Sequence, residues 1–243
     1  MVTGSFLNDP RSAGTRDSFW DVDQAGSPTC SFLAALAAYA ERTGSTNDLV
    51  QKIRYDSSTE QYGVRLWMGG QWKTYWVSGD WTEGRDPGGK LWVTLYQKAY
   101  LKAWNVQCRD ADGRLMPESQ WYSPSGTGWR NAGNAMDALT PGTSRWASIS
   151  AASASAVRSQ VYSTATYGMV AASKSSGTTG GVVANHSYMI YDAFTENGTW
   201  KVRLYNPWGT DSAGGALDSS NNGMITLTWS QFTANFTGYY RNS

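Results

Sequence analysis

Residues 185–209 read NHSYMIYDAFTENGTWKVRLYNPWG and decide the fold of this 243-residue chain. Two runs rich in aromatic and β-branched residues flank Glu196-Asn197-Gly198, a composition typical of a tight turn, so they predict a β-hairpin. The first strand begins beside His186, the only histidine in the chain, and the second ends at Asn206. We therefore expect one hairpin to carry an imidazole and a carboxamide at the same end.

The register of this hairpin decides whether Asn206 reaches His186. A two-residue turn at Asn197-Gly198 would pair Asn206 with Met189 and leave the two side chains on opposite faces. One bulge or an odd-length loop would instead pair Asn206 with Tyr188 and bring the two side chains to one face. Trp208 would then share that face and shield an Asn206–His186 hydrogen bond from water. The alternative is that Asn206 only begins a strand-ending turn and that His186 has a structural role.

A second informative stretch, DVDQAGSPTCSFLAALAAYAE, covers residues 21–41. Ser27 is a good helix N-cap and Pro28 suits the first helical position, which puts Cys30 in the first turn. There the unpaired backbone N–H groups and the helix dipole favour a thiolate. The apolar residues that follow predict an amphipathic helix ending near Gly44, with its apolar stripe at Phe32, Leu33, Leu36, Ala37 and Ala40. Without this context, a lone cysteine on such a helix is usually a small buried hydrophobe.

Gln24 lies six residues before Cys30, on the loop that enters the helix. Its carboxamide N–H₂ can join the backbone N–H of Cys30 as an oxyanion-hole donor, although a loop glutamine is more often simply solvated. A cysteine protease needs a thiolate, a base, a side chain that orients the base, and an oxyanion hole. Cys30, His186, Asn206 and Gln24 supply these four roles.

Composition excludes several other classes. A formal net charge of +1 without a basic cluster argues against nucleic-acid binding, and no apolar run approaches the roughly 18 residues of a membrane span. The first 19 residues lack the apolar core of a signal peptide and read as a flexible leader. The two cysteines, Cys30 and Cys108, exclude a disulfide-rich scaffold but leave one bridge open, and no metal-ligand spacing is present. Abundant Ser, Thr, Gly and Trp would suit an extracytoplasmic protein.

The rest of the chain predicts an α+β fold. The first half leans helical, with a β-hairpin at 61–81 centred on Gly69-Gly70 and a helix at 91–104. The second half leans β, with strands at 167–173 and from 223, the latter followed by a helical turn before 232. Short helices are expected at 135–139 and about 151–163. We divide the chain into a leader (1–19), a helix-rich part with the nucleophile helix (20–141) and a β-rich part with the His/Asn hairpin (142–243).

These blocks resemble the protease core of calpains, which are papain-like cysteine proteases. The resemblance runs from about Trp20 to the C-terminus and is carried by these stretches, in order: DVDQ, the helix at Cys30, YGVRLW, LWVTLYQKAYLKAW, ALTPG, NHSYMIYDA, LYNPWG and WSQFTANFTGYY. It implies a two-lobe fold with the active site in the cleft, Cys30 as nucleophile, His186 as general base and acid, Asn206 as its orienter, and Gln24 in the oxyanion hole.

The chain also departs from the calpain pattern. Pro28-Thr29 replaces a Gly-Asp pair, Ser31 replaces a bulky Trp, and Pro141 replaces a second Gly. Calpain cores often bind calcium through carboxylates. Asp21 stands at one matching position and is the one calcium-ligand candidate, but Asn134 and the run Ser219–Asn222 stand where acidic residues are expected. We therefore expect no required cofactor, and calcium binding stays an open alternative. The accessory modules of animal calpains are missing, as in a minimal, bacterial-type member or one domain of a larger protein.

The function predicted from these residues is hydrolysis of protein or peptide substrates by a Cys-His-Asn endopeptidase through an acyl-enzyme. The alternative is a protein-interaction module that keeps the fold but has weakened catalysis. Acyl transfer to an amine would use the same residues and remains open.

Overall fold

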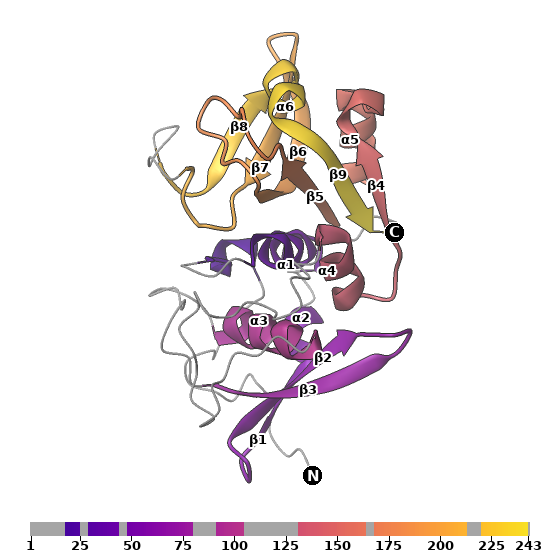
Figure 1. Cartoon of the computed structure of the whole chain (residues 1–243), viewed down its shortest axis with the longest axis vertical. Helices are drawn as coiled ribbons and strands as arrows, with labels where there is room; N and C mark the ends of the chain where they lie inside the picture. The colour runs from indigo at the N-terminus through magenta and orange to yellow at the C-terminus, as the bar shows by residue number, and fades with distance from the viewer. Residues whose placement is uncertain are drawn as a thin grey trace.

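The computed structural model (Figure 1) describes residues 18–24, 29–43, 48–79, 91–104, 131–163, 168–212 and 220–242. Within these ranges the fold is α+β, as predicted, with two antiparallel sheets. The helices are η2 (Phe19–Asp21, 3-10), α1 (Cys30–Thr43), α2 (Asp48–Gln51), α3 (Leu91–Ala103), α4 (Ala132–Leu139), η4 (Ile149–Ala151, 3-10), α5 (Ala154–Val161) and α6 (Trp229–Asn235). None of the helices in these ranges is long and apolar enough to cross a membrane.

The first sheet has three strands in the order β1-β2-β3, namely β1 (Ile53–Asp56), β2 (Gln61–Trp67) and β3 (Trp72–Ser78). The hairpin predicted for 61–81 is confirmed as β2–β3, apart from its last two residues, which lie outside the described ranges. Trp67 pairs with Trp72 across a turn in which Gly69 and Gly70 both take positive φ, of 64° and 79°. The sequence did not predict β1, which adds to the outer edge of β2.

Helix α1 lies at the centre of the molecule, between the second sheet and the helices α3 and α2 (Figure 1). Its residues from Phe32 to Ala40 are all buried, so the prediction of a single apolar stripe was wrong. The helix contacts α4 and also the strands β5 and β6. A helix that is buried on all sides needs apolar residues around its whole circumference, as α1 has. Its predicted caps, Ser27 and Gly44, lie outside the described residues.

Small residues let α1 and the second sheet approach closely. A Cβ added at Gly168, the first residue of β5, would lie 2.9 Å from the Cβ of Ala38. The small alanine side chains of α1 therefore allow β5 of the second sheet to pack closely against the helix.

Helix α3 confirms the helix predicted at 91–104, and it is buried along most of its length. Helix α4 includes the predicted 135–139 but begins three residues earlier. The reason is a cap: the Asn131 side chain accepts a hydrogen bond from the backbone N–H of Asn134 at 3.1 Å. Capping by a residue four positions upstream of the apolar run extends the helix.

The second sheet has six strands in the order β4-β9-β5-β6-β7-β8. They are β4 (Ser144–Ser148), β5 (Gly168–Ser173), β6 (Ser187–Glu196), β7 (Thr199–Tyr205), β8 (Met224–Thr228) and β9 (Phe236–Asn242). The predictions of β5 to β8 are confirmed, whereas β4 and β9 were missed. The helix predicted near 151–163 is α5, preceded by η4, and the helical turn after β8 is α6, which a Thr228–Gln231 capping box begins.

The buried side chains of the described residues form two hydrophobic clusters. One joins α1, α3, α4 and the first sheet, and also takes in Val170, Met189 and Tyr205 from the second sheet. The other is built from the second sheet, α5 and α6. The boundary proposed at 141/142 falls between α4 and β4, and the division into domains stays a prediction.

Candidate active site

The β6–β7 hairpin has the bulge that the sequence required. Near the turn, Asp192 pairs with Arg203, but beyond Tyr191 the register shifts by one residue, so that Met189 pairs with Tyr205. Continued by one residue, this register places Asn206 opposite Tyr188. The predicted change of register is therefore confirmed.

Asn206 and His186 meet at the end of this hairpin. The Nε2 atom of His186 lies 2.8 Å from Oδ1 of Asn206. The same Oδ1 accepts the backbone N–H of Trp208 at 3.1 Å, and Nδ2 donates to the carbonyl of Asp211 at 3.3 Å. These contacts fix which end of the amide faces His186. Because a carboxamide oxygen only accepts, His186 must carry its proton on Nε2, which leaves Nδ1 free to accept another.

Aromatic rings enclose the imidazole. The Trp208 ring centroid lies 4.7 Å from that of His186, and Tyr188 makes an edge contact at 5.0 Å. Ser173 of β5 fixes the His186 backbone, because its hydroxyl accepts the His186 N–H at 2.9 Å and its own N–H donates to the His186 carbonyl at 2.9 Å. Trp208 thus lies where the sequence predicted a shield. Tyr188 was missed, although it lies two residues after His186 and so on the same strand face.

Burial controls the protonation of His186. The side chain is 5% exposed, and loss of solvation lowers its pKa to about 4, against the opposing effect of the Asn206 hydrogen bond. The resting imidazole is therefore neutral at pH 7.

Cys30 is the first residue of α1, as expected from its place after Ser27 and Pro28. The residue before it, Thr29, is fully buried and positions the start of the helix: its carbonyl accepts the N–H of Leu33 at 2.9 Å. Its hydroxyl accepts a hydrogen bond from Nε2 of Gln97 on α3 at 2.7 Å. Thr29, one of the departures from the calpain pattern, thus anchors the first turn of α1 at Cys30 to a second helix.

The Cys30 thiol is only partly accessible. Burial raises its pKa, and this effect is opposed by hydrogen bonds from the N–H and hydroxyl of Ser187 and from the N–H groups of Ser31 and Cys30. Ser187 directly follows His186, so the thiol lies beside the strand that begins after the imidazole. No hydrogen bond joins Cys30 to His186 in the part of the chain that the structure describes. The second cysteine, Cys108, lies outside the described residues.

The Gln24 loop is tied to the turn after Asn206. The N–H of Gln24 donates to the carbonyl of Pro207 at 2.7 Å, and the side chain of Gln24 is buried. The hydroxyl of Tyr205 donates to the carbonyl of Val22 at 2.7 Å. Gly209 takes a positive φ of 69°, and a Cβ there would lie 2.9 Å from a carboxylate oxygen of Asp23. The glycine of the Asn-Pro-Trp-Gly run therefore permits the close approach of this loop.

Asp211 also supports Asn206, a role that the sequence analysis did not predict. Asp211 is fully buried; its backbone carbonyl accepts from the Asn206 amide, and its carboxylate accepts the N–H of Gly223 at 2.9 Å. The backbone N–H of Asn206 in turn donates to the carbonyl of Gly223 at 2.7 Å. These bonds join the two ends of the β7–β8 connection behind Asn206, a long-range arrangement that residue spacing does not encode.

The described residues contain no cluster of carboxylates like those of many calcium sites. Among them, no three His, Cys, Asp or Glu side chains gather as a metal cluster would require. A carboxylate oxygen of Asp21 accepts the indole N–H of Trp92 at 3.0 Å. The carboxamide oxygens of Asn221 and Asn222 accept the backbone N–H groups of Asp211 and Met224. These amide side chains hold the loop by backbone hydrogen bonds at a place where the calpain pattern has acidic residues.

Comparison with known families identifies the class of protein to which this chain belongs. The family model of the calpain family cysteine proteases matches residues 6–224, most of the chain. The chain therefore belongs to the calpain family of cysteine proteases. No curated protein matched the chain in a sequence comparison.

Proposed function

We propose that this protein is a calpain-type endopeptidase that cleaves peptide bonds through Cys30, His186 and Asn206, with Gln24 in the oxyanion hole. The observation that carries the proposal is the buried 2.8 Å contact between His186 Nε2 and Asn206 Oδ1. It leaves Nδ1 as the one ring nitrogen able to take a proton, on a residue next to Ser187, which contacts Cys30. Membership of a cysteine protease family supports protein substrates.

The first half of the reaction forms a thioester. The Cys30 Sγ–H proton moves to Nδ1 of His186 as the sulfur attacks the peptide carbonyl carbon. The carbonyl oxygen becomes an oxyanion, which the Gln24 side-chain N–H₂ and the Cys30 backbone N–H stabilise. When the C–N bond breaks, His186 returns the proton to the leaving amine, and the acyl group stays on Cys30.

The second half releases the acyl group. His186 Nδ1, neutral again, removes a proton from a water molecule that attacks the thioester. The C–S bond then breaks, the thiolate recovers its proton from His186, and the carboxylic acid product leaves. Asn206 keeps Nε2 protonated throughout, because its oxygen can only accept.

The neutral resting state fits a site completed by its substrate. Burial raises the pKa of Cys30 and lowers the pKa of His186, so a thiolate–imidazolium pair is disfavoured while the two are apart. A small movement that brings Nδ1 to the sulfur would let each charge stabilise the other. We propose that this movement needs the substrate and not calcium.

The proposal is tested with a fluorogenic peptide or casein as substrate. Cys30→Ala should abolish cleavage, and Cys108→Ala is the matched control that should leave it unchanged. Both should be assayed with calcium and with a chelator. Undiminished cleavage by Cys30→Ala would refute the nucleophile. Adding an amine such as glycine methyl ester to the wild type separates hydrolysis from acyl transfer, which would give an amine-tagged product.

A further inference from the structure

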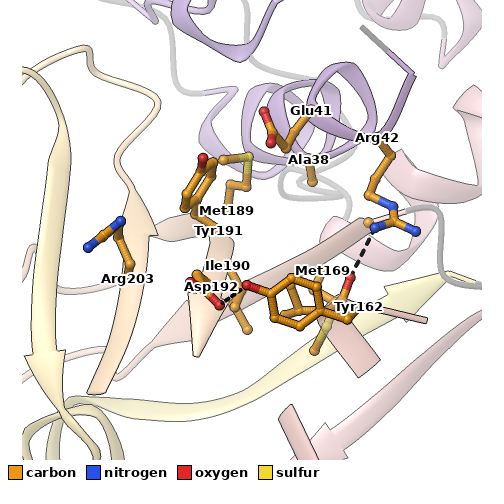
Figure 2. Close-up of a pocket in the computed structure, with 12 residues that line it drawn as sticks. Ala38, Glu41, Arg42, Tyr162, Met169, Met189, Ile190, Tyr191, Asp192 and Arg203 are labelled. Atoms are coloured by element: carbon orange, nitrogen blue, oxygen red, sulfur yellow. Dashed lines mark hydrogen bonds between the residues drawn. The ribbon is translucent and has the colours of Figure 1, made fainter. Parts of the chain in front are cut away.

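A cavity of about 330 Å³ lies between the second half of α1 and the strands β5, β6 and β7 (Figure 2). None of its lining residues belongs to the candidate active site. Apolar side chains in its lining include Ala38, Met169 and Ile190, and the polar side chains include Glu41, Arg42, Tyr191, Asp192 and Arg203. The volume lies at the low end of the range of about 300–1,000 Å³ seen for small-molecule sites.

The lining carries charges of both signs that are not paired with each other. Among the described residues, the Arg203 guanidinium has no hydrogen bond to a carboxylate; it lies 4.9 Å from the ring centroid of Phe194. The Glu41 carboxylate likewise accepts no hydrogen bond within the described ranges. Its neighbour Arg42 donates instead to the carbonyls of Val161 and Ser163, at 3.1 and 2.7 Å.

Tyr191 lies between Glu41 and Arg203 in Figure 2. Burial raises the pKa of its phenol, Glu41 adds to this effect, and Arg203 opposes it, so both charges act at one place in the cavity. Burial also raises the pKa of Glu41, and the charge of its neighbour Arg42 only partly opposes this effect. Asp192 accepts the Tyr162 hydroxyl at 2.9 Å and adds a second carboxylate to the lining.

We propose that this cavity binds a small zwitterion with an apolar side chain, of the size of a free amino acid or dipeptide. Its carboxylate would bind the Arg203 guanidinium in a forked, charge-assisted contact. Its ammonium group would bind Glu41, and its side chain would contact the cavity lining at Met169 and Ile190. One ligand thereby satisfies both charges, which a cation or an anion alone does not.

The position of the cavity gives such a ligand an influence on catalysis. Helix α1 begins at Cys30, and strand β6 follows His186 directly. A ligand that holds Glu41 of α1 and Arg203 of β7, the partner of β6, would tie these elements together. This consequence rests on the proposed function, whereas the binding itself does not.

The binding is tested by calorimetry on the Cys30→Ala variant, which removes any contribution from catalysis. The probe is L-leucine, with N-acetyl-L-leucine lacking the cation and L-leucinamide lacking the anion. We expect saturable binding of leucine and at least about tenfold weaker binding of both blocked forms, because each loses one charge-assisted contact. Absence of saturable leucine binding up to about 10 mM, or equal binding of a blocked form, would overturn the proposal.

Variants assign the two charges. Arg203→Gln and Glu41→Gln should each weaken leucine binding by at least about tenfold. Lys201→Gln, on the same strand but outside the cavity, should leave binding unchanged. Leucine affinity that is unaffected by both cavity variants would contradict the proposed site. Should a variant fail to fold by circular dichroism, the blocked ligands on the unsubstituted cavity decide the question.

Discussion

Because His186 is the only histidine in the chain, its protonation is directly measurable. Burial lowers its pKa from the ordinary 6.5 to about 4. At pH 6 an ordinary histidine would be about 76% protonated, whereas His186 should be only about 1% protonated. A titration of the folded protein from pH 7.5 to 3.5 therefore follows the protonation of His186.

The same shift predicts how stability depends on pH. The pKa of His186 is lower in the folded state than in the unfolded state, so between pH 6.5 and 4 the unfolded chain binds the extra proton. The stability that the folded protein gains by keeping His186 neutral is fully present above pH 6.5 and is lost as the pH falls through 4. A fall in pKa from 6.5 to about 4 corresponds to about 3 kcal/mol of unfolding free energy.

Nitrogen-15 NMR of the imidazole and urea denaturation at several pH values test these numbers. The Nε2 of His186 should keep its proton, and Nδ1 should stay unprotonated down to about pH 5. His186→Gln is the matched control, because glutamine does not titrate; its stability should lack this loss of about 3 kcal/mol below pH 6.5. An imidazolium with a pKa at or above 6.5 in the folded protein would refute the reasoning and indicate a preformed ion pair with Cys30.

Three substitutions probe the rest of the site. Asn206→Ala should destabilise the fold by about 1–3 kcal/mol, because the N–H groups of His186 and Trp208 lose their buried acceptor; urea denaturation measures this, and an unchanged midpoint would contradict it. Gln24→Ala should lower kcat by about 10²–10³ with little change in KM if its amide stabilises the oxyanion; steady-state kinetics in which only KM changes would exclude that role. Gly209→Ala should reduce thermal stability, since the new Cβ meets Asp23 at 2.9 Å; a melting temperature equal to the wild type would show that the loop moves freely.

Local pattern was enough to predict several of the helices and hairpins. The turn chemistry at Gly69-Gly70 predicted the β2–β3 hairpin, and helical spacing predicted α3. The change of register in the β6–β7 hairpin followed from a chemical requirement, that Asn206 should reach His186, and the bulge past Tyr191 provides it. The calpain resemblance supplied the roles, and the family match bears out the class of protein.

What the sequence could not predict are contacts between distant segments. Strand β9 lies between β4 and β5 in the second sheet. Its seven residues, which include Gly238, do not by themselves predict a strand or the strands it pairs with. The full burial of α1 depends on two neighbouring layers that meet only in the folded protein. The hydrogen bond from Gln97 to Thr29 joins α3 to the residue just before Cys30, and spacing along the chain does not predict it.

The central claim is that Cys30 is a nucleophile activated by His186. Its most direct test is labelling of the purified protein with an epoxide thiol inhibitor, with and without calcium, located by peptide mass spectrometry. Because the inhibitor occupies the place of the substrate that completes the site, the account predicts modification of Cys30 at least about tenfold faster than of Cys108 without calcium, and loss of this difference in His186→Gln. Labelling that requires calcium would restore a metal switch. Equal labelling of the two cysteines under both conditions would contradict the claim and favour the interaction module.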